Sequence, residues 1–292
     1  MSDIAGIACR CPLPNDDFDA AWDSIKLAAD VRERLLSHAL LSFTVRQKLP
    51  FELAPLHGLL LLKGPPGTGK TTLSRGLANQ VAKHLPRAKT NYIEIDPHAL
   101  TSSSLGRSQQ ADVKLFEQTI PELAIGGATV VLVDEVETLG VDRQKLSLEA
   151  NPIDVHRATD AVLTGIDRLA QQHKNVLLIA TTNFPKAVDA ALLSRADHVE
   201  EIGLPGAEAR REIILDTLQA IAGIWRDVRG LEGDVDRLAA AAEGLDGRRI
   251  RKAIFAAAAS DIETAKDPNK LNRSQIERAF VHALATQTEI TQ

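Results

Sequence analysis

The sequence predicts an α/β protein in which helices cover both faces of a parallel sheet and a smaller helical domain follows. Two observations carry this prediction. Short apolar runs alternate with amphipathic helical stretches between residues 25 and 205. The runs at 130–133 and 176–179 are apolar on both strand faces, as is typical of central parallel strands. Strands separated by helices imply right-handed crossovers and a covered sheet.

The first of the two predicted domains carries all the expected strands. We expect strands at 58–62, 92–95, 130–133, 176–179 and 199–202. Before and between them, apolar residues at three- and four-residue steps predict helices over 25–45, 70–85, 110–124 and 154–172. Residues 1–24 contain two prolines and an Asn-Asp-Asp run, which indicate an irregular N-terminal arm.

The second domain begins at the Leu204-Pro205-Gly206 hinge and is helical throughout. Helices are expected over 207–222, 234–243 and 247–264. A last helix should open with Ser274 and Glu277, which have the spacing of a capping box. The predicted organisation is therefore an arm (1–24), a nucleotide-binding α/β domain (25–205) and a helical lid domain (206–292).

Net charge, the length of the apolar runs and the cysteine pattern bear on the classes of protein to which this chain can belong. The net charge is -5 and the pI about 5.9, so nucleic acid is not favoured as a partner. No apolar run reaches the ~18 residues of a membrane span, and no signal peptide pattern opens the chain. Cys9 and Cys11 have no second cluster to complete a zinc site, so we read them as free thiols. We expect a soluble cytoplasmic protein.

The strongest motif is a complete phosphate loop between a buried strand and a helix. Its glycines let backbone N–H groups point at phosphate oxygens, and the helix N-terminus adds partial positive charge. We expect Lys70 to reach the β- and γ-phosphates of ATP, and the Thr71 hydroxyl to bind Mg²⁺. The expected nucleotide-binding residues are Gly64, Pro65, Pro66, Gly67, Thr68, Gly69, Lys70, Thr71 and Thr72.

Two further strand ends carry polar side chains. Asp134 and Glu135 follow the strand 130–133, where open α/β sheets bind ligands. We expect Asp134 to hold Mg²⁺ through water and Glu135 to act as general base on the attacking water. Asn183 ends the next strand and is placed to orient that water, although a turn-forming asparagine is the alternative.

Two groups of arginines are candidates for stabilising the charge that develops in phosphoryl transfer. Arg195 lies in Leu193-Ser194-Arg195-Ala196-Asp197, and Arg248 follows Gly244-Leu245-Asp246-Gly247. Either group taken alone could equally be a salt-bridged surface, and spacing leaves both readings open.

The order of these motifs resembles the AAA+ superfamily, and more narrowly the thyroid-receptor-interacting and pachytene-checkpoint ATPases that remodel HORMA-domain proteins. The stretches that carry the likeness are 92–100, 132–139, 161–167, 194–197 and 244–248. By this resemblance, Asn183 is the first sensor, Arg195 the arginine finger that reaches a neighbouring subunit's ATP, and Arg248 the second sensor.

The resemblance also implies partners and assembly. The family forms hexameric rings that thread a partner's terminus, and its bacterial members accompany HORMA proteins and cyclic-oligonucleotide synthases in anti-phage defence. This chain has only a short arm before its ATPase core, so it looks like the compact bacterial type. Its first pore loop reads Ser102 to Arg107 without the family's aromatic residue, which predicts a weaker grip on a threaded peptide.

Three other readings share the nucleotide site. A clamp-loader-like, DNA-associated ATPase should carry basic residues that track a phosphate backbone, and the acidic balance argues against it. A nucleotide-switched binding module with little turnover fits the serine-rich pore loop. A small-molecule kinase fits less well, because the Asp134-Glu135 pair suits hydrolysis.

Overall fold

The computed structural model describes residues 4–85, 89–96, 113–138 and 152–291, with the side chains of 138, 152–159 and 287–291 left out. The pore-loop residues Ser102 to Arg107 lie outside these ranges. The chain forms two compact units. The first holds the sheet, and the second holds residues 203–292 together with the short segments 25–29 and 65–69.

The sheet unit contains six strands in the order β1-β3-β4-β5-β2-β6. All neighbouring strands pair in parallel except β1, which runs antiparallel to β3. The predicted parallel sheet is confirmed. The strands are β1 (Ile7–Leu13), β2 (Leu59–Lys63), β3 (Thr90–Ile95), β4 (Ala128–Val133), β5 (Val176–Thr182) and β6 (His198–Glu201).

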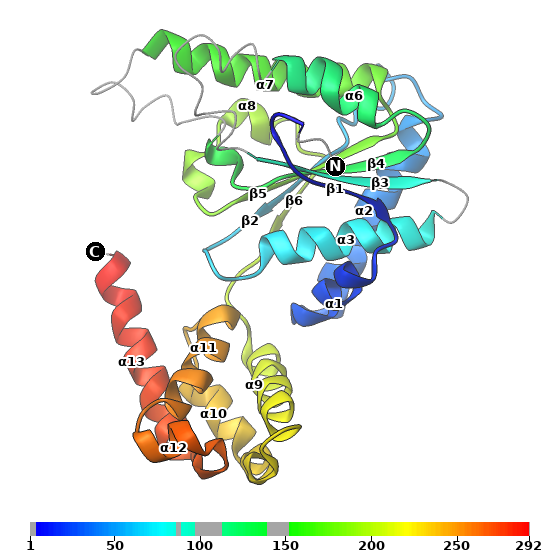
Figure 1. Ribbon diagram of the computed structural model, residues 1–292. Helices are drawn as coiled ribbons and strands as arrows, with labels where there is room; N and C mark the ends of the chain where they lie inside the picture. Colours follow the sequence, from blue (N-terminus) through cyan, green and yellow to red (C-terminus); the bar gives the residue numbers. More distant parts are fainter. Residues whose placement is uncertain (1–3, 86–88, 97–112, 139–151, 292) are drawn as a thin grey trace. The chain divides into compact units, whose positions relative to one another are not determined.

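Helices cover both faces of this sheet (Figure 1). One core joins alternate residues of the central strands to the helices α6 and α7. The opposite face packs against α1, α2 and α3. The helices of the sheet unit are α1 (Asp16–Ser24), α2 (Ala29–Arg46), α3 (Lys70–His84), α6 (Ile120–Leu123), α7 (Pro152–Gln172) and α8 (Ala190–Leu193), and a π-helical turn, Leu115–Thr119, precedes α6.

The N-terminal residues are not the irregular arm that the sequence predicts. Residues 7–13 form β1, which bonds along β3 and covers that edge of the sheet. Residues 16–24 form α1, whose Trp22 is only 9% exposed. A strand paired through its backbone needs little apolar alternation, and prolines are tolerated on an edge strand, so composition alone misses it.

The second unit is helical, as predicted, and has its own core. The predicted helix 247–264 is interrupted, because the Asp261 side chain accepts the Thr264 N–H at 2.8 Å and starts a new helix. The unit's α-helices are α9 (Ala207–Ala222), α10 (Val235–Ala241), α11 (Gly247–Ala258), α12 (Ile262–Lys266) and α13 (Arg273–Thr291), and the segments Arg226–Asp234 and Pro268–Lys270 are 3-10 helical.

The last helix has a capping box, but not the predicted one at Ser274 and Glu277. The Asn272 side chain accepts the Gln275 N–H at 3.2 Å, and the Gln275 side chain accepts the Asn272 N–H at 2.9 Å. Leu271 and Ile276, on either side of this box, are both buried in the core of the unit. Their burial fixes the chain's entry as a hydrophobic staple does, which selects the earlier cap.

No helix in the described part of the chain is both long and apolar enough to span a membrane.

Helix α1 packs closely on α3, with Trp22 lying against Gly76. In an exposed helix, alanine is about 1 kcal/mol more stable than glycine. At Gly76, however, a Cβ would lie 2.6 Å from the Trp22 Cα. We therefore expect Gly76→Ala to destabilise the protein by about 1–3 kcal/mol in urea unfolding.

Gly233→Ala is the matched control, because nothing lies within 4 Å of a Cβ at Gly233. It should change the unfolding free energy by no more than about 0.5 kcal/mol. A Gly76→Ala variant as stable as the parent would contradict the docking of α1 on α3.

Candidate nucleotide site

The carboxyl ends of β2, β4 and β5 bring together six of the predicted site residues, namely Gly64, Lys70, Thr71, Asp134, Glu135 and Asn183. In the parallel register, Lys63 pairs with Thr182 and Val133 pairs with Ala180, so these strands end at the same edge. The residues that follow them, Gly64, Asp134 and Asn183, are therefore neighbours. This is the edge at which open α/β sheets bind ligands.

Lys70 is the first residue of α3, and its side chain lies inside this cluster. The residue is 5% exposed, and its Nζ donates to the Gly64 carbonyl and to Asn183 Oδ1, both at 2.8 Å. A buried ammonium held by oxygen acceptors at a helix N-terminus is well placed to meet a phosphate.

Thr71, one residue further on, donates its hydroxyl to Asp134, with Oγ1 2.8 and 3.0 Å from the two carboxylate oxygens. Hydroxyl and carboxylate oxygens are the hard ligands that Mg²⁺ prefers. The donor set at this position therefore fits the predicted magnesium ion. Thr72 lies in the same first turn of α3.

Glu135 adopts a left-handed backbone conformation with φ of 51°, the only non-glycine residue with positive φ in the described ranges. Such a conformation costs about 1–2 kcal/mol and persists only where the surroundings enforce it. Here the Glu135 N–H donates to Thr181 Oγ1 at 3.0 Å, and the same hydroxyl donates to Asp134. Thr181 thus fixes the turn that carries both acids.

The Asn183 amide links the cation to the predicted base. Its Oδ1 accepts from Lys70, and its Nδ2 donates to Glu135 Oε1 at 2.8 Å. This contact between the two predicted residues favours a role for Asn183 in the site over that of a simple turn-former.

Sequence reasoning missed Glu137 and Thr181 as members of the cluster. Glu137 Oε1 accepts the Asn183 N–H at 2.9 Å, and its Oε2 is buried without a hydrogen-bond partner in the described structure. Glu137 holds the backbone of Asn183, as Thr181 holds that of Glu135. The sequence signals were weak, namely a third acid two residues after Glu135 and a hydroxyl two residues before Asn183.

The loop segment 65–69 is shaped by glycine. Gly67 has φ of 84°, and a Cβ there would lie 2.5 Å from the Asp246 carboxylate. Asp246 is buried and caps α11 by accepting the Arg249 N–H at 2.9 Å. The Gly244 to Arg248 stretch therefore contributes a side chain that lies against the phosphate loop.

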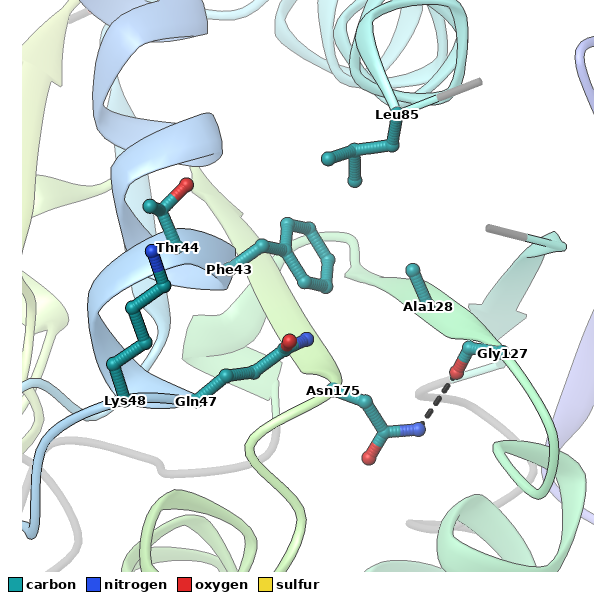
Figure 2. Close-up of a pocket in the computed structure, with 8 residues that line it drawn as sticks. All are labelled: Phe43, Thr44, Gln47, Lys48, Leu85, Gly127, Ala128 and Asn175. Atoms are coloured by element: carbon teal, nitrogen blue, oxygen red, sulfur yellow. Dashed lines mark hydrogen bonds between the residues drawn. The ribbon is translucent and has the colours of Figure 1, made fainter. Parts of the chain in front are cut away.

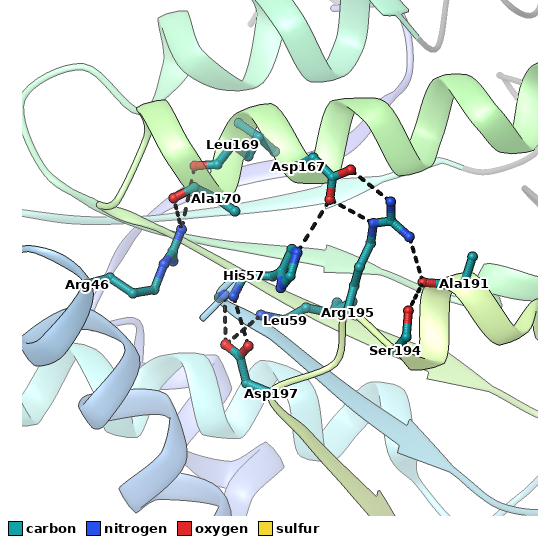
Figure 3. Close-up of polar contacts among 11 residues, drawn as sticks. Arg46, His57, Leu59, Asp167, Leu169, Ala170, Ala191, Ser194, Arg195 and Asp197 are labelled. Atoms are coloured by element: carbon teal, nitrogen blue, oxygen red, sulfur yellow. Dashed lines mark hydrogen bonds and ion pairs between the residues drawn. The ribbon is translucent and has the colours of Figure 1, made fainter. Parts of the chain in front are cut away.

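Of the two predicted arginines, Arg195 shares the sheet unit with Lys70 but has contacts of its own. Arg195 bonds to Asp167 and to the Ala191 carbonyl (Figure 3). Arg248 is exposed in the first turn of α11, in the helical unit. The contacts within this single chain leave the roles predicted for both arginines untested.

A hollow of about 500 Å³ lies at the amino ends of β4 and β5 (Figure 2). The Lys70 cluster lies at the opposite, carboxyl ends of these strands. Phe43, Leu85 and Ala128 supply apolar walls to the hollow, with Lys48 and Asn175 at its polar side. It lacks the paired acids and the phosphate loop, so the predicted chemistry does not belong there.

Comparisons with known proteins agree with this geometry. The profile of the ATPase family associated with various cellular activities (AAA) matches residues 60–204. CD-NTase-associated protein 6 of Pseudomonas aeruginosa is 48% identical over 280 residues, which cover 95% of this chain and 92% of that protein.

Two solved structures share the fold. PCH-2 of C. elegans aligns with a TM-score of 0.76 and 26% identity, over 96% of this chain and 75% of that one. A chain of the E. coli MS115-1 HORMA:CdnC:Trip13 complex aligns with a TM-score of 0.75 and 20% identity, over 94% of each chain. The resemblance to the thyroid-receptor-interacting and pachytene-checkpoint proteins is thereby confirmed. With a close relative matched along nearly its whole length and a phosphate loop in the expected setting, this chain belongs to the AAA family and is an ATPase.

Proposed function

We propose that this chain is a ring-forming, ATP-driven machine that remodels a HORMA-domain protein and thereby regulates anti-phage signalling by a cyclic-oligonucleotide synthase. The observation that carries the proposal is the 48% identity with CD-NTase-associated protein 6 across almost all of both chains. The fold shared with a chain of a HORMA:CdnC:Trip13 complex supports it. Neither relative is named as a clamp loader, and the acidic charge balance also disfavours that alternative.

Within this proposal, ATP binds with its phosphates at the loop Gly64 to Thr72. Lys70 contacts the β- and γ-phosphates. Thr71 and Asp134 hold Mg²⁺, which neutralises phosphate charge when bound. The Thr71–Asp134 hydrogen bond supports this assignment, because it already brings the two ligands together.

Glu135 is the proposed general base. Its carboxylate is oriented by the Asn183 amide, and its backbone by Thr181. A base held in one orientation abstracts a proton from water without first losing side-chain freedom. Asn183, which touches both Lys70 and Glu135, is placed to register whether a γ-phosphate is present.

The arginines complete the proposal. Arg195 acts on the ATP of the adjacent subunit, and Arg248 is the second sensor, as the family resemblance implies. The proposed assembly is a homo-oligomer, expected to be a hexamer. We place it in the cytoplasm, and the free thiols of Cys9 and Cys11 are consistent with that reducing compartment.

Glu135→Gln tests the base. The variant should bind ATP as the parent does, because the phosphate contacts remain. Its turnover should fall by about 10²–10⁴-fold, since a carboxamide cannot accept the proton. Nucleotide affinity and phosphate release measure the two effects, and the assembled form should persist in ATP.

The matched control is Glu122→Gln, an exposed acid at α6 that should leave turnover unchanged. A Glu135→Gln variant that hydrolyses ATP at the parent rate would remove Glu135 from the chemistry.

Arg195→Ala tests action across subunits. Alone, the variant should lose about 10³–10⁵-fold in turnover. Mixed with Glu135→Gln subunits, whose own sites are inactive but whose Arg195 is intact, it should regain turnover. Arg168→Ala, which removes an exposed arginine paired with Glu117, should keep the parent rate. Absence of rescue in the mixture would show that Arg195 does not act in trans.

Remodelling is tested with the HORMA-domain protein and the CD-NTase encoded nearest to this chain. ATP and the parent chain should dissociate their complex, as followed by size-exclusion chromatography, whereas Glu135→Gln should bind it without dissociating it. Hydrolysis that proceeds while the complex stays intact would argue against remodelling as the function.

A further inference from the structure

The Arg195 side chain is ordered by contacts within its own chain (Figure 3). Its Nε donates to Asp167 Oδ1 at 2.7 Å and its Nη2 to Asp167 Oδ2 at 2.8 Å, which is a bidentate pair. Its Nη1 donates to the Ala191 carbonyl at 2.8 Å. These contacts use three of the five N–H donors of a guanidinium. The remaining two, one on each terminal nitrogen, have no acceptor among the described residues.

The backbone around Arg195 is fixed as well. Two residues later, the Asp197 carboxylate accepts the His57 and Gly58 N–H groups at 2.8 and 2.7 Å, immediately before β2. On the other side, α8 is capped by Asp189, which accepts the Ala191 N–H at 2.7 Å. Both ends of the segment that carries Arg195 are thus anchored.

The helix that carries Asp167 packs on the sheet. Asp167 lies on α7 between Ile166 and Leu169, which are both buried in the sheet core. His57 Nε2 lies 3.4 Å from Asp167 Oδ1, but burial lowers the pKa of His57, so the ring is neutral near pH 7. The charge of the carboxylate is therefore balanced by Arg195, and the pair keeps its geometry.

We propose that Asp167 is a positioning residue for hydrolysis in the adjacent subunit. It holds one edge of the Arg195 guanidinium, so the two remaining N–H donors can contact the γ-phosphate bound to the neighbouring subunit. The arginine side chain then loses no further rotamer freedom on making this contact. This inference rests on the trans role proposed for Arg195. Removing the Asp167 carboxylate should lower the rate of ATP hydrolysis in the adjacent subunit by about ten- to thirtyfold. This factor corresponds to the rotamer entropy that a freely moving arginine would lose on binding the phosphate.

The test uses mixed assemblies of two kinds of subunit and places Asp167→Asn in the subunit that supplies the arginine. The acceptor subunit is Arg195→Ala, which lacks the arginine but has an intact ATP site. The donor subunit is Glu135→Gln, which supplies Arg195 but cannot hydrolyse ATP at its own site, so all turnover in the mixture comes from Arg195 acting in trans. The Glu135→Gln donor should restore turnover, and a Glu135→Gln/Asp167→Asn donor should restore about ten- to thirtyfold less.

Glu200 offers a matched control. It forms an equivalent bidentate pair with Arg34 in the same unit, with both N–O distances at 2.9 Å. A Glu135→Gln/Glu200→Gln donor should restore turnover as fully as Glu135→Gln does. In the reverse arrangement, an Asp167→Asn acceptor mixed with the Glu135→Gln donor should hydrolyse ATP at its own site normally.

The outcomes separate the two proposals. Full restoration by the Asp167→Asn donor refutes the positioning role while leaving Arg195 as the finger. No restoration by Glu135→Gln itself refutes the finger, and the positioning role with it.

If Asp167→Asn does not fold, Asp167→Glu displaces the carboxylate by one methylene and should weaken the donor alone. A weakened Asp167→Glu acceptor would instead refute the positioning role.

Discussion

The site depends on the parallel pairing of β5 with β2 on one side and β4 on the other. In this register, Val133 lies opposite Ala180, so Asp134, the first residue after β4, lies beside Thr181 of β5. The Thr181 hydroxyl then joins the Asp134 carboxylate to the Glu135 N–H. A slip of one residue would turn Thr181 to the other face and release the strained backbone of Glu135. The strand register therefore determines the orientation of Asp134 and Glu135, the two acids of the proposed site.

Side-chain hydrogen bonds also fix the amino end of β5. Arg46 is 2% exposed and donates to the Val176 carbonyl at 2.6 Å, where β5 begins. It also donates to Leu169 and Ala170 carbonyls near the end of α7, where a cation is favoured by the helix dipole. Burial lowers the pKa of Arg46 to about 10, which leaves it charged at neutral pH.

Asn175, just before the strand, donates to the Ala124 and Gly127 carbonyls. The central strand is thus held at both ends by side chains distant in sequence.

Much of this fold could be predicted because its signals are local. Helical periodicity located α3 and α9, and two-faced apolar runs located β4 and β5. The phosphate loop and Asp134-Glu135 were recognisable from residue type and context. The order of the strands, the edge strand β1 and the capping box at Asn272 depend on pairing or burial that no local pattern encodes. For the same reason Glu137 was missed, since its partner Asn183 lies 46 residues away.

The positions of the charged groups fit the proposal that a neighbouring subunit completes the site. Within the described contacts, Lys70, Asp134, Glu135 and Asn183 form one continuous network, while Arg195 forms another with Asp167. A guanidinium paired with its own carboxylate adds little positive potential to a phosphate elsewhere on the same chain. Among the described residues, no acceptor meets its unused N–H edge, and a neighbouring subunit would supply one in the proposed assembly. On this view, assembly brings a preordered cation to each site, and hydrolysis becomes a property of neighbouring subunits. Such an arrangement couples turnover to ring formation without requiring any further change in the residues that bind ATP.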